Sequence, residues 1–296
     1  RDRHAPSAEA LLREALAQEP RHLPSLCNLG MVLHASAMTA GGDRTGERFV
    51  EAERMLEAAV ALQPSHTDSL ANLARLKQDK SEEVEAGRLF EEVLRFDPKH
   101  VAALNGIATI LDARAFETWR ADSDPMWRDA RAIVEKADSY YKRALNLEPN
   151  NPDTLCNRAS LLQSHLGDEG GSEEAEQLYL KAIAINPHHS GAMYNLAFLR
   201  QIDGQLEEAM RLYEDAFALE PQREEYREAV MQFAKSQIGD MVYEQQKAEN
   251  DEEEVRDPVA MRMEALKRYA DQPPGPLSSR FDDSPEGAPE TRTDLF

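Results

Sequence analysis

Apolar and polar residues follow one another with a helical period through most of this chain. In residues 190–221, apolar side chains recur every three or four positions, which is the spacing of one face of an α-helix. The pattern pauses at Asp203-Gly204, because glycine accepts backbone angles that end a helix, and it stops at Pro221, which cannot continue one. The segment therefore predicts two amphipathic helices joined by a tight turn.

The same two-helix pattern recurs along the chain, and a proline follows each second helix. These prolines are at positions 20, 64, 98, 149, 187 and 221. Two of the intervals are 34 residues long, and the other three, of 38, 44 and 51 residues, contain insertions. Each second helix carries a small, a bulky and then a small or β-branched residue: Ala8/Leu12/Ala15, Ala52/Leu56/Ala59, Ala86/Phe90/Val93, Ala137/Tyr141/Ala144, Ala175/Tyr179/Ala182 and Ala209/Tyr213/Ala216.

A helix-turn-helix unit with this period and these small and large positions resembles the tetratricopeptide repeat. The resemblance covers about residues 8–240 and implies an all-α fold, a right-handed α-solenoid of stacked helix pairs. The expected parts are a partial leading repeat at 1–22, five repeats over 23–221 with insertions at 35–48, 112–129 and 167–172, a C-terminal capping helix at 222–247, and an acidic, largely disordered tail at 248–296 with a short helix at 258–270. The polar, glycine-containing run at 35–48 predicts a flexible loop.

The longest insertion contains both tryptophans of the chain. Phe116, Trp119, Met126 and Trp127 lie close together in this sequence, and the helical pattern continues on both sides of them. We therefore expect both helices of this unit to be longer than those of the others. The aromatic side chains either pack against each other within the hairpin or form an exposed contact for a partner, since Trp and Met are enriched in interface cores.

The net charge of −21 bears on the class of partner. The tail from 248 to 296 holds 13 acidic and 6 basic residues, so most of the excess lies in the repeats. Nucleic-acid binding requires a basic surface, and the sequence has no Lys/Arg cluster. A protein partner with a neutral or basic segment is expected instead, and no nucleic acid.

The two cysteines and the hydropathy suggest a compartment. Cys27 and Cys156 fall in first helices three repeats apart, too distant for a disulfide, and free thiols favour a reducing intracellular compartment, the cytoplasm above all. No apolar run is long enough to span a membrane. The sequence begins with Arg1 inside a repeat, so a targeting peptide upstream is left open.

The resemblance implies that the first helices line a concave groove that binds an extended peptide. Asn28, Asn72, Asn157 and Asn195 occupy the same place in four first helices, whereas the third unit has Gly106 there and Asn105 one place earlier. An asparagine can donate to a peptide carbonyl and accept from a peptide N–H. The set resembles the asparagine ladder of the superhelical repeats in O-linked N-acetylglucosaminyltransferases. The alternative is that each amide bonds the neighbouring helix. The expected groove residues are Asn28, Asn72, Arg75, Asn105, Asn157, Tyr194, Asn195 and Phe198.

The expected groove is acidic, with Asp68, Asp112 and Asp153 against the single cation Arg75. Co-chaperones of the resembled family bind a C-terminal carboxylate with a Lys/Arg clamp. Here the corresponding positions hold Cys27, Ala71, Asn105, Cys156 and Tyr194. The carboxylate tails of heat-shock chaperones are therefore not expected as partners.

The sequence offers little for catalysis. His100 and His188-His189 fall in turns after prolines, where polar residues are common, and no nucleophile–His–acid set or phosphate-binding glycine loop is present. We expect no enzyme activity, no cofactor and no metal site, but a scaffold or adaptor for protein binding. Two alternatives remain open: the substrate-docking repeats of a larger enzyme, such as a glycosyltransferase, or a structural assembly subunit that uses the Trp119/Trp127 hairpin.

Overall fold

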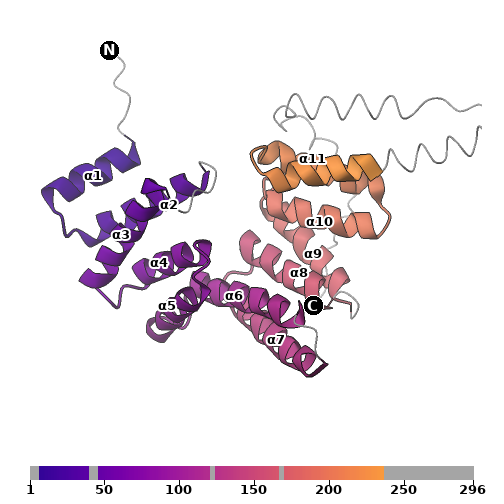
Figure 1. Cartoon of the computed structure of the whole chain (residues 1–296), viewed down its shortest axis with the longest axis horizontal. Coiled ribbons are helices and arrows are strands. Elements are labelled where there is room, and N and C mark those ends of the chain that lie inside the picture. The colour runs from indigo at the N-terminus through magenta and orange to yellow at the C-terminus, as the bar shows by residue number, and fades with distance from the viewer. Residues whose placement is uncertain (1–6, 40–45, 121–123, 167–169, 237–296) are drawn as a thin grey trace, which may run out of the picture. The chain divides into compact units, whose positions relative to one another are not determined.

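The computed structural model describes residues 7–39, 46–120, 124–166 and 170–236 (Figure 1). The side chains of residues 39, 119, 120 and 124–129 lie outside this description. Every regular element in the described ranges is an α-helix. The chain forms two compact units, which we call unit 1 (Arg1–Ile185) and unit 2 (Asn186–Phe296) and describe separately.

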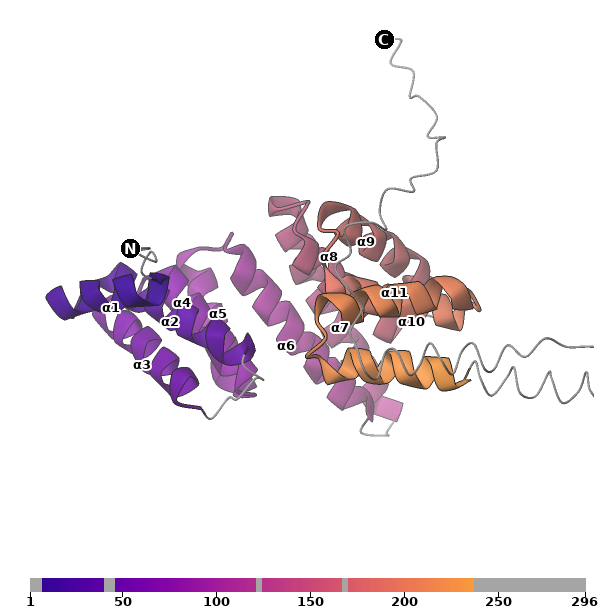
Figure 2. The ribbon, with the colours of Figure 1, turned by 90° about the horizontal axis from the view of Figure 1, so that it is seen from above.

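Unit 1 is a series of helix pairs, and this confirms the predicted all-α solenoid. Each even-numbered helix from α2 to α8 packs along the helix that follows it, and successive first helices also contact each other (Figures 1 and 2). The helices are α1 (Ala8–Gln18), α2 (Leu23–Thr39), α3 (Glu47–Leu62), α4 (Thr67–Asp79), α5 (Glu83–Phe96), α6 (Val101–Arg120), α7 (Asp124–Leu147), α8 (Pro152–Leu166) and α9 (Gly171–Ile185).

Unit 2 contains one helix pair and the start of a further helix. The pair is α10 (Ser190–Ile202) and α11 (Leu206–Leu219), and residues 224–236 are helical. Gly204 has a φ of 75°, so the predicted Asp203-Gly204 turn uses the left-handed backbone that glycine tolerates. The helical residues 224–236 fall within the predicted capping helix, and residues 237–247 lie outside the described part.

The small and large positions of the second helices form the core, because they face the first helix of the same pair. In all five complete pairs these three residues are buried. Leu56 and Tyr141, for example, are fully inaccessible to solvent. The hydrophobic core of unit 1 is therefore distributed between neighbouring helices, as in repeat proteins.

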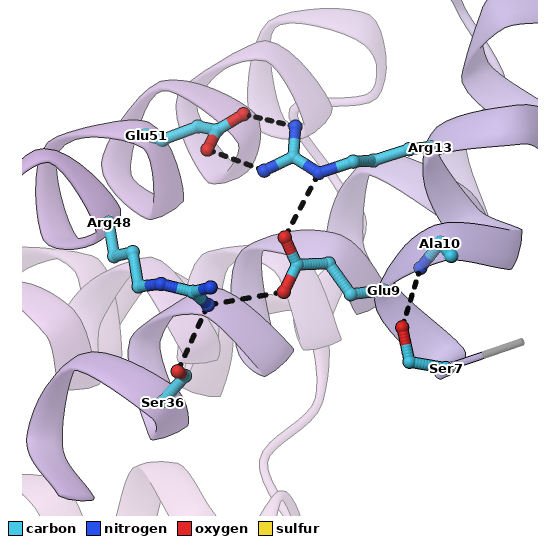
Figure 3. Close-up of polar contacts among 7 residues, drawn as sticks. All are labelled: Ser7, Glu9, Ala10, Arg13, Ser36, Arg48 and Glu51. Carbon is cyan, nitrogen blue, oxygen red and sulfur yellow. Dashed lines mark hydrogen bonds and ion pairs between the residues drawn. The ribbon is translucent and has the colours of Figure 1, made fainter. Parts of the chain in front are cut away.

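Helix α1 differs because no first helix of its own precedes it in the described residues. Its corresponding residue Ala8 is exposed, and Leu12 and Ala15 are only half-buried. Leu12 and Leu16 nevertheless pack against the core of unit 1, and polar contacts add to this packing (Figure 3). Arg13 donates two hydrogen bonds of 2.7 Å to Glu51 on α3 and one of 3.0 Å to Glu9. Arg48 of α3 in turn donates to Glu9 at 3.1 Å.

The predicted insertions differ in how much of their sequence is helical. Helices α6 and α7 are the longest of the described helices, with 20 and 24 residues. The predicted loop at 35–48 begins too early, because α2 continues to Thr39. The reason is apolar packing: Ala37 is buried and Met38 packs against the core of unit 1. Residues 171 and 172 of the third insertion likewise belong to α9.

Candidate functional site

A groove crosses the first helices of unit 1. It is a cavity of about 720 Å³ lined by residues of α2, α4, α6 and α8, by Phe90 of α5, and by residues of the turns that precede α4, α6 and α8. Four predicted asparagines, one from each of these helices, line it: Asn28, Asn72, Asn105 and Asn157. Arg75 lines it as well. The structure thus brings together five of the eight groove residues expected from the sequence.

The periodicity of each first helix directs these side chains outward. On α4, Leu70, Leu73 and Ala74 are buried in the core. Asn72 and Arg75, three residues apart, share the opposite face, because residues at this spacing are neighbours on a helix surface. The apolar stripe that anchors each helix therefore also positions the polar residues of the groove.

Two of the asparagines contact the neighbouring first helix. The amide nitrogen of Asn72 lies 3.4 Å from the sulfur of Cys27 on α2. Asn105 donates to the hydroxyl of Thr154 on α8 at 2.6 Å, and its amide oxygen is buried without a hydrogen-bond partner in the described part of the chain. Asn28, by contrast, is exposed. The asparagines thus differ in how open their amides are to a ligand, and Asn105 is the most restricted.

Gly106 explains why the third unit lacks an asparagine at the common position. A Cβ atom built on Gly106 would lie 2.3 Å from ring atoms of Phe90 on α5, far inside van der Waals contact. Phe90 is the bulky residue of its unit and is buried. Any side chain at position 106 would require this ring to move, so the polar group is supplied from Asn105 instead.

The groove carries more negative than positive groups. Asp68, Glu148 and Asp153 line it together with the single guanidinium of Arg75. Asp68 lies 3.5 Å from His100, which also lines the groove. The prediction for Asp112 does not match this site, since its carboxylate bonds His165 of α8 at 2.8 Å and does not line the groove.

Sequence reasoning missed the contribution of the turns between repeats. His66, His100, Glu148 and Asn151 all line the groove and all lie between a second helix and the next first helix. His66 and His100 also cap helices, because their Nδ1 atoms accept hydrogen bonds from backbone N–H groups at 3.2 and 3.3 Å. The prolines that mark these turns are the signal that could have identified them.

Tyr194 and Phe198 lie in a second pocket, on unit 2. This pocket of about 480 Å³ lies between α10, α11 and the helical residues 224–236. Burial raises the pKa of Tyr194, and the nearby carboxylate of Glu225 raises it further. The pKa of Tyr213 is also raised, chiefly by burial. Asn195, on the same helix, does not line this pocket or the groove of unit 1.

The predicted second interface falls mostly outside what the structure describes. Phe116 lies on α6 with 47% of its surface exposed. Trp119, Met126 and Trp127 lie on α6 and α7, but their side chains are outside the described residues. The two interpretations of this hairpin therefore both stay predictions.

A metal site and a membrane span are both missing from the described ranges. Within them, no grouping of three or more His, Cys, Asp or Glu side chains could hold a metal ion. None of the described helices combines the length and apolar character of a membrane span. His189, one of the turn histidines, caps α10 by accepting from the N–H of Ala192 at 3.0 Å. Cys27 and Cys156 are both buried, and neither forms a disulfide.

Comparison with known proteins bears on the family and the fold. Residues 140–177 and 178–211 match a family model described as tetratricopeptide repeat. No curated protein matches the sequence. A thermophilic tetratricopeptide-repeat protein of Thermus thermophilus is 19% identical, with a TM-score of 0.58 over 71% of this chain and 98% of its own.

Two larger proteins are similar to most of the chain. Human IFIT1, solved as a dimer with m7Gppp-AAAA, is 15% identical, with a TM-score of 0.63 over 92% of this chain and 60% of its own. Yeast Tom70 is 20% identical, with a TM-score of 0.52 over 88% of this chain and 47% of its own. At these identities the likeness shows a shared fold and nothing about ligands.

Proposed function

We propose that this chain, whose residues 140–211 match the tetratricopeptide-repeat family, is a non-catalytic scaffold that holds an extended segment of a partner protein in the groove of unit 1. The observation that carries the proposal is the alignment of Asn28, Asn72, Asn105 and Asn157 in one groove. Amide side chains at repeated intervals suit a repeating ligand, and an extended peptide backbone presents an N–H and a carbonyl at every residue.

The asparagines are suited to different parts in this binding. Asn28 is exposed, so its amide can both donate and accept. The amide nitrogen of Asn72 contacts the sulfur of Cys27, which is a weak acceptor. The amide oxygen of Asn72 can therefore accept a hydrogen bond from a peptide N–H. Asn105 mainly holds α6 to α8 through Thr154. We therefore assign backbone binding to Asn28, Asn72 and Asn157.

The charge of the groove supports a neutral or basic segment. Asp68, Glu148 and Asp153 outnumber Arg75, so an acidic peptide would meet net repulsion. The same electrostatics argue against RNA in this groove. Human IFIT1 was solved with m7Gppp-AAAA, so the fold itself accommodates such a ligand. A polyanion, however, requires cations that neutralise its phosphates, and here Arg75 is the one Lys or Arg among the groove-lining residues.

We also propose a cytoplasmic location for the chain. The two buried thiols, Cys27 and Cys156, are compatible with a reducing compartment. A thiol-alkylation experiment in cells, read by mass spectrometry of the intact chain, would find both cysteines reduced. Finding either one in a mixed disulfide would contradict the assignment.

A peptide array tests the proposed class of ligand. The full chain would be applied to unrelated peptides whose net charge runs from negative to positive, and to a single-stranded RNA oligonucleotide. Binding should increase from acidic to basic peptides, and it should weaken in Asn72→Ala/Asn157→Ala. The variant Asn146→Ala/Gln177→Ala is the control, because both side chains are exposed on second helices. Preference for acidic peptides or for the RNA would overturn the proposal.

A further inference from the structure

The pocket on unit 2 combines aromatic rings with carboxylates. Its lining includes Tyr194 and Phe198 of α10, Tyr213 of α11, and Phe233 of the helical segment 224–236. The carboxylates of Glu225 and Glu228 come from that same segment. Among the residues that line the pocket there is no lysine or arginine. The site therefore presents apolar walls and a negative rim.

The rings form one contiguous group. Tyr194 stacks on Tyr226 with ring centroids 4.9 Å apart. Tyr194 and Tyr213 pack in a T-shaped arrangement with ring centroids 5.5 Å apart. Tyr213 lies 5.8 Å from Phe233. Phe198 keeps 47% of its surface exposed, so an apolar ring remains available at the mouth of the pocket. Such a fixed aromatic surface binds flat or cationic groups well.

The two carboxylates are placed to act together. Glu225 and Glu228 are three residues apart, so they share one face of the helix. Neither forms an ion pair with another residue in the described part of the chain. The nearby arginines bind elsewhere: Arg227 pairs with Glu224 at 2.9 Å, and Arg223 pairs with Glu220 at 3.7 Å. Arg223 interacts electrostatically with Glu225 but forms its ion pair with Glu220, so neither pocket carboxylate is held in a direct ion pair in the described part of the chain.

The same aromatic group already contacts a guanidinium at Tyr226, a ring that does not line the pocket. Arg223 lies over the ring of Tyr226 with its central carbon 4.9 Å from the ring centroid. Tyr226 in turn stacks on Tyr194, whose ring lines the pocket. Tyr226, one ring of this group, therefore already accepts a guanidinium, which also donates a hydrogen bond to the Tyr226 hydroxyl.

We propose that the pocket on unit 2 binds an arginine side chain of a partner protein. The guanidinium would lie against Phe198 and Tyr194 and donate hydrogen bonds to Glu225 and Glu228. Arginine fits better than lysine, because its planar group stacks on rings and donates to two carboxylates in a fixed geometry. This inference does not rest on the groove of unit 1, and each site can be tested without the other.

Charge favours a partner over the chain's own C-terminal tail. Residues 237–296 follow directly after Ser236, which lines the pocket. Residues 249–257 of that tail contain six acidic residues and one arginine, and such a block is repelled by Glu225 and Glu228. Four further arginines, Arg262, Arg268, Arg280 and Arg292, follow this block, so the tail is the alternative occupant that the experiment separates from the partner arginine that we assign.

The test uses the full chain labelled with 3-fluorotyrosine and observed by fluorine NMR. The signals of Tyr194 and Tyr213 are assigned with the variants Tyr194→Phe and Tyr213→Phe. The probes are N-acetyl-arginine methylamide and its uncharged analogue, N-acetyl-citrulline methylamide. Citrulline retains the shape and lacks the charge, so the pair isolates the electrostatic part of binding.

The arginine probe should shift both signals and the citrulline probe should not. Glu225→Gln/Glu228→Gln should weaken arginine binding about fivefold. Glu91→Gln/Glu207→Gln removes the same charge at exposed positions outside the pocket and should leave binding unchanged. Equal shifts with both probes, or binding unaffected by Glu225→Gln/Glu228→Gln, would overturn the proposal.

A second label distinguishes binding of a partner arginine from binding of the chain's own C-terminal tail. With 13C-methyl methionine, Met261 and Met263 report on the tail. If Glu225→Gln/Glu228→Gln moves their signals, the tail occupies the pocket and the assignment to a partner is wrong. If their signals stay in place while the arginine probe binds, the proposal is supported. Failure at this pocket would leave peptide binding by Asn72 and Asn157 in unit 1 unaffected.

Discussion

Gly106 is the residue at which packing most clearly decides the chemistry of the groove. The other first helices have asparagine at this place, at positions 28, 72, 157 and 195. In α6 the ring of Phe90 occupies the space that a Cβ atom would need, 2.3 Å away. Core packing between α5 and α6 therefore removes one amide from the repeating set, and Asn105 enters the groove one position earlier.

Gly106→Ala should lower the free energy of unfolding by about 1–3 kcal/mol, because an extra methyl group in a packed core displaces its neighbours. Gly87→Ala is the matched control in the adjacent helix α5. There the nearest side-chain atom, on Ile110, is 3.9 Å from the added carbon, so alanine should stabilise the helix by about 0.5–1 kcal/mol. Urea unfolding followed by circular dichroism measures both. Equal effects of the two substitutions would contradict the packing explanation.

The position of a single side chain could be predicted where it depends on the helical period. It could not be predicted where it depends on a contact with a residue distant in the sequence. The period correctly assigned Asn28, Asn72 and Arg75 to one surface, because they alternate with buried leucines. It could not assign Asp112, whose carboxylate pairs with His165, 53 residues further along the chain. It also could not separate Tyr194 and Phe198 from the others, because the pocket that contains them is completed by residues 225–236.

At the scale of elements, α1 is attached to unit 1 by apolar packing of Leu12 and Leu16 and, in addition, by charge. It has no fully buried residue, whereas Arg13, Glu9, Arg48 and Glu51 form a connected set of ion pairs (Figure 3). Arg13 lowers the pKa of both Glu9 and Glu51 below the ordinary value of 4.5. A lowered pKa in the folded state means that these carboxylates stabilise the docking of α1 above this pH. This stabilisation is lost as the pH falls below 4.5 and the two carboxylates become protonated.

Acidification from neutral pH to below about 4.5 should therefore release α1 before the rest of unit 1. Hydrogen exchange measured by mass spectrometry would show lower protection factors in residues 8–18 and little change in α6. The effect should be modest, since exposed ion pairs contribute only about 0–1 kcal/mol each. Arg13→Met should reduce protection of α1 at neutral pH and remove most of its acid sensitivity. Unchanged acid sensitivity in that variant would contradict this role for Arg13.

The elements themselves were predictable because their boundaries are set by local chemistry. Each second helix of a complete pair ends two residues before its proline, as at Leu62 and Leu219. The error at α2 has a tertiary cause. Ala35 to Thr39 read as the start of a polar loop, but burial of Ala37 and packing of Met38 extend the helix.

At the scale of the whole molecule, the loss of stability in one repeat of a solenoid has little effect on distant repeats. Leu33 is fully buried in α2 and packs in the core of unit 1. Leu33→Ala should cost about 2–5 kcal/mol locally. Because each repeat contacts only its neighbours, hydrogen exchange should accelerate in α2–α4 and stay unchanged in α10 and α11. A uniform acceleration across the chain would instead indicate one cooperative unit.

The central claim is that the groove of unit 1 binds a peptide backbone through its asparagines. The most direct test is the affinity of one labelled basic peptide, selected on the array, measured by fluorescence anisotropy. We expect about tenfold weaker binding to Asn72→Ala/Asn157→Ala, from the loss of two hydrogen-bonding groups, and no change in Asn146→Ala/Gln177→Ala. Equal affinity of the groove variant and the wild type, with helicity retained, would contradict the claim.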